Sequence, residues 1–176
     1  MNKKLVQECV KLSLREAYKG MRDGDGGPFG AVIVRKGKVI SVGHNEVLKK
    51  NDPTCHAEVV AIRKACAKLK NFDLSDCEIF TSCEPCPMCF STIHWAKMRK
   101  MYFGCTRDDA AHIGFDDKFI YDVLQGKAKK KQVTAVQVAR AECLKPFKEW
   151  EGKAGKKRYG QILLLTGICP GVASVD

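Results

Sequence analysis

Two short segments of the sequence carry side chains that could hold a metal ion. They are His56-Ala57-Glu58 and Pro85-Cys86-Pro87-Met88-Cys89. The two cysteines are three residues apart, which places them on one face of a first helical turn. Two thiolates and one imidazole supply three of the four ligands of a tetrahedral zinc ion, and water can take the fourth position. His56, Cys86 and Cys89 are therefore predicted to bind a catalytic Zn²⁺.

Glu58 is predicted to carry the proton that such a site must move. A metal-bound water becomes a nucleophile at neutral pH only if a nearby group removes its proton. Residues two apart in a regular helix point about 200° from each other. His56 must therefore lie at the mouth of its helix if both side chains are to reach one site. Helix N-termini also carry a partial positive charge, which stabilises thiolates.

A closed structural zinc site is the alternative. Cys83-Glu84-Pro85-Cys86 offers a competing pair of cysteines, and Cys83 could supply a fourth ligand. A structural site has no use for Glu58, however. A proline also precedes Cys86, as in the His-x-Glu and Pro-Cys-x-x-Cys signature of zinc deaminases. These two features favour the catalytic interpretation.

The surrounding sequence predicts an α/β fold. A β-hairpin is indicated first, followed by alternating strands and helices, so a three-layer α/β/α sandwich around a central mixed five-stranded sheet is expected. The predicted strands are 29–35, 39–44, 78–82, 101–105 and 134–138. The predicted helices are 3–20, 56–69, 86–97, 115–124 and one that follows Pro146. The glycine-rich loop 24–28 is not a dinucleotide fingerprint, because Phe29 occupies the third glycine position and the loop precedes a strand.

Length and composition bound the class of protein. The chain has 176 residues, of which 45% are hydrophobic, and this excludes a disordered chain. The longest strongly apolar run, 162–165, is far shorter than the roughly 20 residues of a membrane-spanning helix, and the start lacks the apolar stretch of a signal peptide. Ten cysteines in a chain of this size favour a reducing compartment. A cytoplasmic protein without a membrane partner is expected.

Most of the excess positive charge lies in the last third of the chain. The formal net charge is +11, and residues 118–159 hold 12 basic and 4 acidic side chains. Lysines outnumber arginines by 23 to 8. Surfaces that read bases favour arginine, whose planar group pairs bidentately with guanine edges. The segment is therefore interpreted as a solvated surface, and a nucleic-acid partner is not expected.

Four stretches resemble the cytidine deaminase-like superfamily and, within it, the bacterial-type guanine deaminases. They are residues 26–32, 51–58, 81–89 and 114–121. The second and third contain the His-x-Glu and Pro-Cys-x-x-Cys motifs, which indicate the superfamily. The last reads Gly114-Phe115-Asp116-Asp117-Lys118-Phe119-Ile120-Tyr121 and indicates the subfamily. The similarity covers residues 5–159 almost without gaps, which predicts one deaminase domain, 1–159, and a C-terminal extension, 160–176, without an assigned role.

The resemblance implies hydrolysis of guanine to xanthine and ammonia. Zinc hydroxide would attack C2 of guanine, while Glu58 carries the proton from the water to the ring nitrogen and then to the departing amine. Asp117 would be a second catalytic proton shuttle. The family also implies a homodimer in which segment 145–159 crosses to the partner and closes its site. The residues implied to contact the substrate are Phe29, Asn45, Ala57, Trp95 and Tyr159.

Several of these residues also have a purely structural interpretation. Phe29 could be a core residue, Asn45 could stabilise a turn, and Asp116 and Asp117 could each cap a helix. Trp95 could pack in the core. The alternative functions are a guanosine or other nucleoside deaminase, a tRNA adenosine deaminase, and a zinc-binding module without activity. The intact Glu58 disfavours the last of these.

Overall fold

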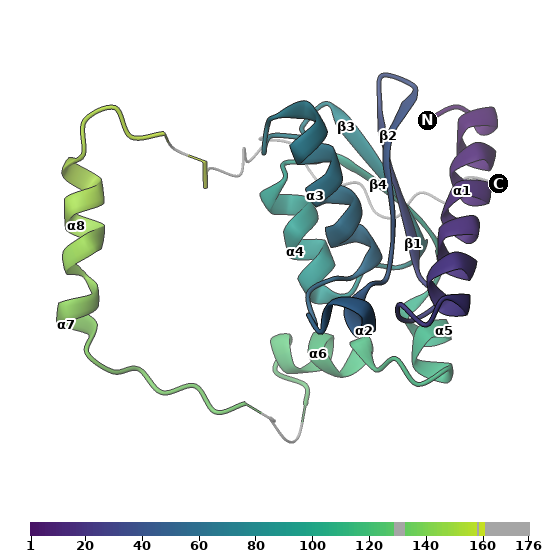
Figure 1. Cartoon of the computed structure of the whole chain (residues 1–176). Coiled ribbons are helices and arrows are strands. Elements are labelled where there is room, and N and C mark those ends of the chain that lie inside the picture. Colours follow the sequence, from purple (N-terminus) through teal and green to yellow (C-terminus); the bar gives the residue numbers. More distant parts are fainter. Residues whose placement is uncertain (129–132, 158, 161–176) are drawn as a thin grey trace. The chain divides into compact units, whose positions relative to one another are not determined.

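The structure is a computed structural model that describes residues 1–128, 133–157 and 159–160. The chain divides into two units, Met1–Thr134 and Ala135–Asp176, which are described separately (Figure 1). All of the predicted extension except Gly160 lies outside the described residues. The domain boundary at residue 159 remains a prediction.

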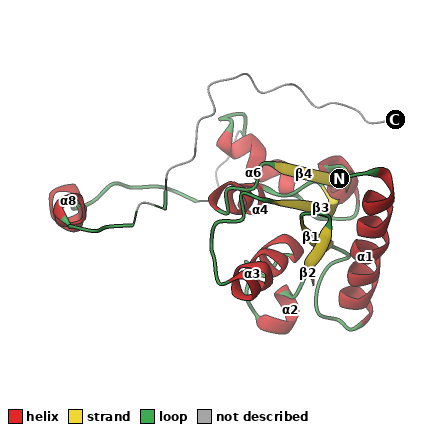
Figure 2. Cartoon of the chain, turned by 90° about the horizontal axis from the view of Figure 1, so that it is seen from above, coloured by secondary structure: helices red, strands yellow, loops and turns green. Residues whose placement is uncertain are grey.

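A mixed sheet forms the centre of the first unit (Figure 2). Its strand order is β2-β1-β3-β4. β1 pairs antiparallel with β2 and with β3, and β3 pairs parallel with β4. The strands are β1 (Gly30–Arg35), β2 (Lys38–His44), β3 (Cys77–Cys83) and β4 (Lys100–Cys105).

The helices of the first unit include all those predicted there and two short ones that were not. Helices of four to six residues are too short to show a hydrophobic period, which explains why α2 and α5 escaped prediction. The helices are α1 (Lys3–Arg22), α2 (Val47–Lys50), α3 (Ala57–Leu69), α4 (Pro87–Trp95), α5 (Arg107–His112) and α6 (Asp117–Leu124).

Helices cover both faces of the sheet. Side chains alternate between the two faces along a strand, so Ala31 and Ile33 of β1 pack in the cluster that includes α3 and α4. Val32 and Val34 pack instead in the cluster that includes residues of α1. Figure 1 shows α1 on one side of the strands and α3 and α4 on the other. The expected α/β architecture, with helices on both faces of a mixed sheet, is therefore present.

The prediction of a fifth strand is wrong for the described residues. Residues 134–138 form a loop without strand pairing in this part of the chain, and the side chains of Val136 and Val138 are each 73% exposed. Their β-branched residues favour an extended backbone, but a strand forms only where a neighbouring edge supplies hydrogen-bond partners. The local sequence indicates the extended backbone, but it does not show whether a neighbouring strand edge is available.

The close approach of β2 to α3 requires a glycine. A Cβ atom at Gly43 would lie 2.6 Å from the backbone oxygen of Ala57 and 2.8 Å from the backbone nitrogen of Ala61. Both neighbours are backbone atoms, so they cannot rotate away as a flexible side chain would. Gly43 thus sets how closely the first turns of α3, which follow His56, lie against the sheet.

Two lysines of α3 contact the outer edge of β2. Lys64 Nζ donates a hydrogen bond to the carbonyl oxygen of Val42 at 3.2 Å, and Lys68 Nζ donates one to that of Ile40 at 3.0 Å. β2 is an edge strand of the sheet. Two carbonyls of this edge strand are therefore satisfied by side chains of α3.

A buried polar network holds the glycine-rich loop. His44 lies between two carboxylates, with Nδ1 at 3.2 Å from Glu16 and Nε2 at 2.8 Å from Asp25. Lys49 donates to the same oxygen of Asp25 at 2.9 Å. The hydrogen bonds from Lys49 and His44 hold the pKa of Asp25 below its usual value. The network links α1, β2 and α2 to the loop that leads into β1.

No helix of the described residues is long and apolar enough to cross a membrane. The cytoplasmic location stays a prediction.

The second unit contains the predicted last helix. This helix, α8 (Lys145–Gly152), has Pro146 in its first turn, where a missing N–H costs nothing. A short helix that was not predicted, α7 (Arg140–Cys143), precedes it. Phe147 and Trp150 of α8 are exposed.

Candidate metal centre and cavity

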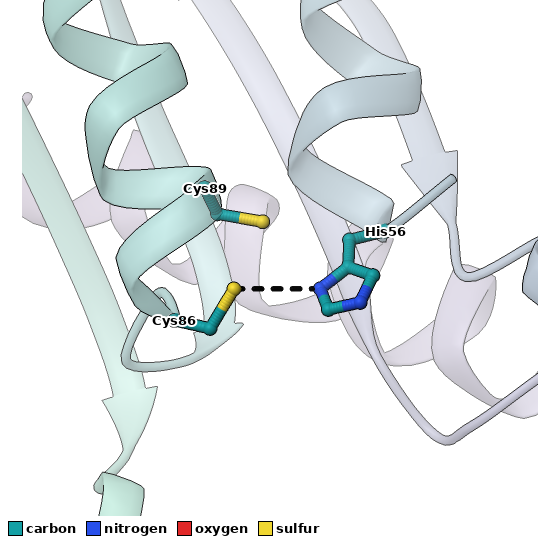
Figure 3. Close-up of side chains that lie close together, drawn as sticks. All are labelled: His56, Cys86 and Cys89. Carbon is teal, nitrogen blue, oxygen red and sulfur yellow. Dashed lines mark hydrogen bonds between the residues drawn. The ribbon is translucent and has the colours of Figure 1, made fainter. Parts of the chain in front are cut away.

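Three predicted metal ligands lie together at the N-terminal ends of two helices. One ligand atom each from His56, Cys86 and Cys89 lies within 4.8 Å of the other two, and Cys86 Sγ is 3.6 Å from His56 Nδ1. Figure 3 shows the side chains of Cys86 and Cys89, from the start of α4, directed toward His56, from the start of α3. This group of potential ligands, found among the described residues, consists of the three zinc donors predicted from the sequence.

Helix capping explains how a histidine and a glutamate two residues apart reach one place. His56 is the N-cap of α3 and has an extended backbone, with φ −68° and ψ 156°. Glu58 is the second residue of the helix. The prediction that His56 lies at the mouth of its helix is therefore confirmed. Cys86 is likewise the extended N-cap of α4, with Pro87 as the first helical residue.

The charge state of the two thiols fits a bound cation. Hydrogen bonds from Cys89 and His56 lower the pKa of Cys86 to about 4, so this thiol is ionised. The hydrogen bond between Cys89 and Cys86, and then burial, raise the pKa of Cys89, because both favour the protonated thiol over a second thiolate. A divalent cation bound between the two sulfur atoms would favour the ionised form of both. The donor set therefore fits zinc.

Glu58 lies beside the three ligands in a buried position. Its relative exposure is 7%, and burial is the main cause that raises its pKa to about 7. A carboxyl group with this pKa can accept and donate a proton at neutral pH.

Two of the ligands, His56 and Cys86, border a cavity of about 380 Å³, within the size range of small-molecule sites. Its lining brings together His56, Cys86 and Glu58 with three further predicted residues, Phe29, Asn45 and Asp117. Residues of the glycine-rich loop, of the starts of β1 and α2, of the carboxyl end of β3 and of the loop before α6 complete it. They are Gly26, Gly27, Gly30, Val47, Leu48, Thr81, Ser82, Cys83, Glu84 and Phe115.

One side of the cavity is aromatic and another is polar. Phe29 and Phe115 meet edge to face, with ring centroids 4.8 Å apart. Gly27 leaves room for this pair, since a Cβ there would lie 2.7 Å from Phe115 Cζ and 2.9 Å from Phe29 Cε2. The side-chain oxygen of Asn45 accepts a hydrogen bond from the Val47 N–H at 3.1 Å. This turn bond orients the asparagine and leaves its NH₂ group as a donor for the cavity.

The two adjacent aspartates have different surroundings. Asp116 is the N-cap of α6, and its side chain accepts a hydrogen bond from the Phe119 N–H at 3.2 Å. Asp117 lines the cavity instead. Burial, and then the nearby Cys86, raise the pKa of its carboxyl group above the usual value.

Four other residues considered in the sequence analysis are Trp95, Ala57, Cys83 and Tyr159. Trp95 ends α4, is 57% exposed and lines neither the cavity nor the core. Ala57 is buried beside His56 but is not part of the cavity lining. Cys83 lines the cavity outside the three-ligand group, and its thiol donates to the Thr106 carbonyl at 3.3 Å. Tyr159 belongs to the second unit. Contacts of Ala57, Trp95 and Tyr159 with a substrate stay predictions.

Sequence reasoning missed Phe115 and Glu84 as site residues. Phe115 directly precedes the two aspartates in the sequence. Its place in the same motif as Asp117 could have identified it as a site residue. Glu84 follows strand β3, at the carboxyl end of a parallel pair, where site residues gather in α/β folds.

Comparisons with known proteins give a consistent result. Residues 3–105 match the family described as the cytidine and deoxycytidylate deaminase zinc-binding region. The chain is 47% identical to guanine deaminase of Bacillus subtilis over 150 residues, which is 85% of this chain and 96% of that protein. It is 40% identical to a tRNA-specific adenosine deaminase of Aquifex aeolicus over 94 residues, which is 53% of this chain and 62% of that protein. The X-ray structure of the Bacillus subtilis guanine deaminase superposes with a TM-score of 0.82 at 45% identity, covering 90% of this chain and 99% of the other.

Proposed function

Since the chain belongs to the cytidine and deoxycytidylate deaminase zinc-binding family, we propose that it is a zinc-dependent guanine deaminase. The reaction hydrolyses guanine to xanthine and ammonia. The observation that carries this proposal is that the zinc-type donors lie together and that two of them, His56 and Cys86, border one cavity with the buried Glu58. The relative named for this activity matches the chain well beyond the family's zinc-binding region.

The metal ligands and the residues of the cavity have distinct roles in the proposed reaction. His56, Cys86 and Cys89 would hold zinc, which supplies a Lewis acid that makes a water nucleophile available at neutral pH. Glu58 accepts the proton of the water that attacks C2, passes it to a ring nitrogen of the purine, and helps to protonate the departing amine. Asp117 provides a second group that can relay protons to the leaving ammonia. Asn45 donates a hydrogen bond to the purine, and Phe29 lies against its ring.

A nucleic-acid substrate is the second candidate. It is favoured by the 40% identity to a tRNA-specific adenosine deaminase. That similarity spans 94 residues and 53% of the chain, whereas the similarity to the guanine deaminase spans 150 residues. The free base is therefore the preferred substrate, and no nucleic-acid partner is required.

The substrate is tested by ammonia release from a panel of guanine, guanosine, adenine, cytosine and a tRNA anticodon stem. We expect kcat/KM for guanine to exceed that for each other small substrate by at least about 100-fold, because the buried donors would be left unpaired by the wrong base. Wild-type protein loaded with zinc is compared with protein stripped by a chelator. Inosine formation in the tRNA stem without ammonia from guanine would establish the second candidate instead.

We propose that the enzyme is a homodimer whose segment 145–159 closes the partner's site. Exposed apolar side chains in the second unit support this, since apolar surface is more stable when covered. They are Val136, Val138, Phe147, Trp150 and Tyr159.

Truncation tests the exchange. A chain that ends after Tyr159 should stay a dimer and deaminate guanine, whereas one that ends before Pro146 should lose activity. Light scattering after gel filtration reports the mass, and ammonia release reports turnover. An inactive monomer on removal of residues 160–176 alone would place the interface in the extension and contradict the exchange of segment 145–159.

A further inference from the structure

Three side chains from separate segments, Glu84, Arg107 and Tyr121, meet next to the turn that leads into Cys86. Arg107, the first residue of α5, donates to Glu84 from its backbone nitrogen at 3.2 Å and from Nε at 3.0 Å, and its Nη2 bonds the second carboxylate oxygen. The guanidinium carbon lies 4.1 Å from the ring centroid of Tyr121 in α6. Arg107 thus bridges the turn that precedes α4 and the helix α6.

Tyr121 also contacts the turn that leads into the predicted metal ligand Cys86. Its hydroxyl group donates a hydrogen bond to the carbonyl oxygen of Pro85 at 2.8 Å, and Pro85 is bonded directly to Cys86. Tyr121 also follows Asp117 by four residues in α6, so the two side chains lie on the same face of the helix. One helix face therefore carries both the contact to the ligand turn and the carboxyl group in the cavity.

The sheet explains why these segments come together. β3 and β4 are parallel, with Cys83 opposite Cys105, and the Glu84 N–H donates to the Cys105 carbonyl oxygen at 2.8 Å. The residues that follow both strands emerge at the same edge. Glu84 and Arg107 are then neighbours in space although 23 residues separate them.

We propose that Glu84, Arg107 and Tyr121 form a positioning clamp that fixes the Asp117 carboxyl group relative to Cys86. The clamp residues act through Asp117 and Cys86. Arg107 and Tyr121 lie outside the cavity lining, and Glu84, which is part of it, acts here through its contacts with Arg107. The part that concerns turnover rests on the proposed guanine deamination. Proton relay depends on near-contact geometry, so a displacement of about 1 Å lowers the rate by up to about 100-fold.

The first test removes a single hydroxyl group. Tyr121→Phe keeps the ring beneath Arg107 but loses the bond to Pro85, and we expect kcat for guanine to fall about 10- to 100-fold, with KM and the melting temperature close to wild type. Tyr102→Phe is the matched control, because it removes a hydroxyl group that contacts the N-terminal amine outside the cavity. A kcat within about twofold of wild type for Tyr121→Phe would overturn the clamp.

The second test asks whether Tyr121 acts through Asp117. In an Asp117→Asn background, the additional Tyr121→Phe change should lower kcat by less than about twofold, because the group that it positions is already absent. A merely structural role would give the same loss in both backgrounds. Equal losses would therefore contradict the proposal.

The third test measures the hold on Cys86 without any turnover. Arg107→Met should release zinc to an excess of chelator about 10- to 100-fold faster than wild type, the range typical of residues that orient metal ligands. Arg107→Lys should recover part of the difference, and Arg35→Met, which breaks an exposed pair with Asp76, should release zinc at the wild-type rate. Unchanged release from Arg107→Met would refute the hold on Cys86. A wild-type protein that binds zinc but leaves guanine intact would refute the proposed function alone.

Discussion

Glu58→Gln is expected to keep zinc and the fold while kcat for guanine falls by at least about 10²- to 10⁴-fold. Glutamine has nearly the same shape but can neither accept the proton of the attacking water nor donate it to the purine. Glu58 is buried in the cavity wall, so bulk water cannot easily replace it as the proton carrier. Single-turnover ammonia release, together with zinc content and the melting temperature, measures the effect.

The control for this change is Glu78→Gln. Glu78 pairs with the N-terminal amine and is not part of the cavity lining, so the activity of this variant should match wild type. If Glu58→Gln kept activity within a few-fold of wild type, the proton-carrier role of Glu58 would be wrong. Asp117→Asn would then be the variant to examine, because Asp117 is the other cavity carboxyl group predicted to be catalytic.

Cys89→Ala is expected to lower bound zinc from about one ion per chain to a small fraction and to abolish deamination. Two ligands remain, and the affinity of a three-ligand protein site depends on all of its donors. Metal analysis after dialysis against a weak chelator reports occupancy, and ammonia release reports turnover.

Cys77→Ala is the matched control for Cys89→Ala. Cys77 is also a buried free thiol, but it packs in the apolar cluster with α3 and α4. It should keep its zinc and lose only some stability, because the smaller side chain leaves a cavity. Full zinc occupancy in Cys89→Ala would remove Cys89 from the ligand set.

The candidate site could be predicted from its motifs because the geometry of each motif depends on residues close together in the sequence. The extended N-cap of α3 brings His56 and Glu58 to one cavity, and this requirement follows from the two-residue spacing alone. The start of α4 brings Cys86 and Cys89 together in the same way. Most strands and the longer helices were also predictable, since their apolar periods are local properties of the sequence.

The parts that sequence could not provide depend on contacts between distant segments. Residues 134–138 have the composition of a strand, yet pairing depends on an edge elsewhere in space. The contact of Arg107 with Glu84 follows from the register of β3 against β4, which neither strand encodes alone. The choice of Asp116 over Asp117 as the cap of α6 also depends on which side chain the neighbouring cavity accepts.

The lysines along β2 have a consequence for how the protein behaves at high concentration. Four residues of helix advance about 6.0 Å, and two residues of strand advance about 6.6–6.8 Å. Lys64 and Lys68 therefore match successive outward carbonyls of β2. A strand from another molecule would have to displace both ammonium groups before it could bond there. Charged side chains on an edge strand oppose fibril growth, so we expect Lys64 and Lys68 of α3 to hinder strand addition at this edge.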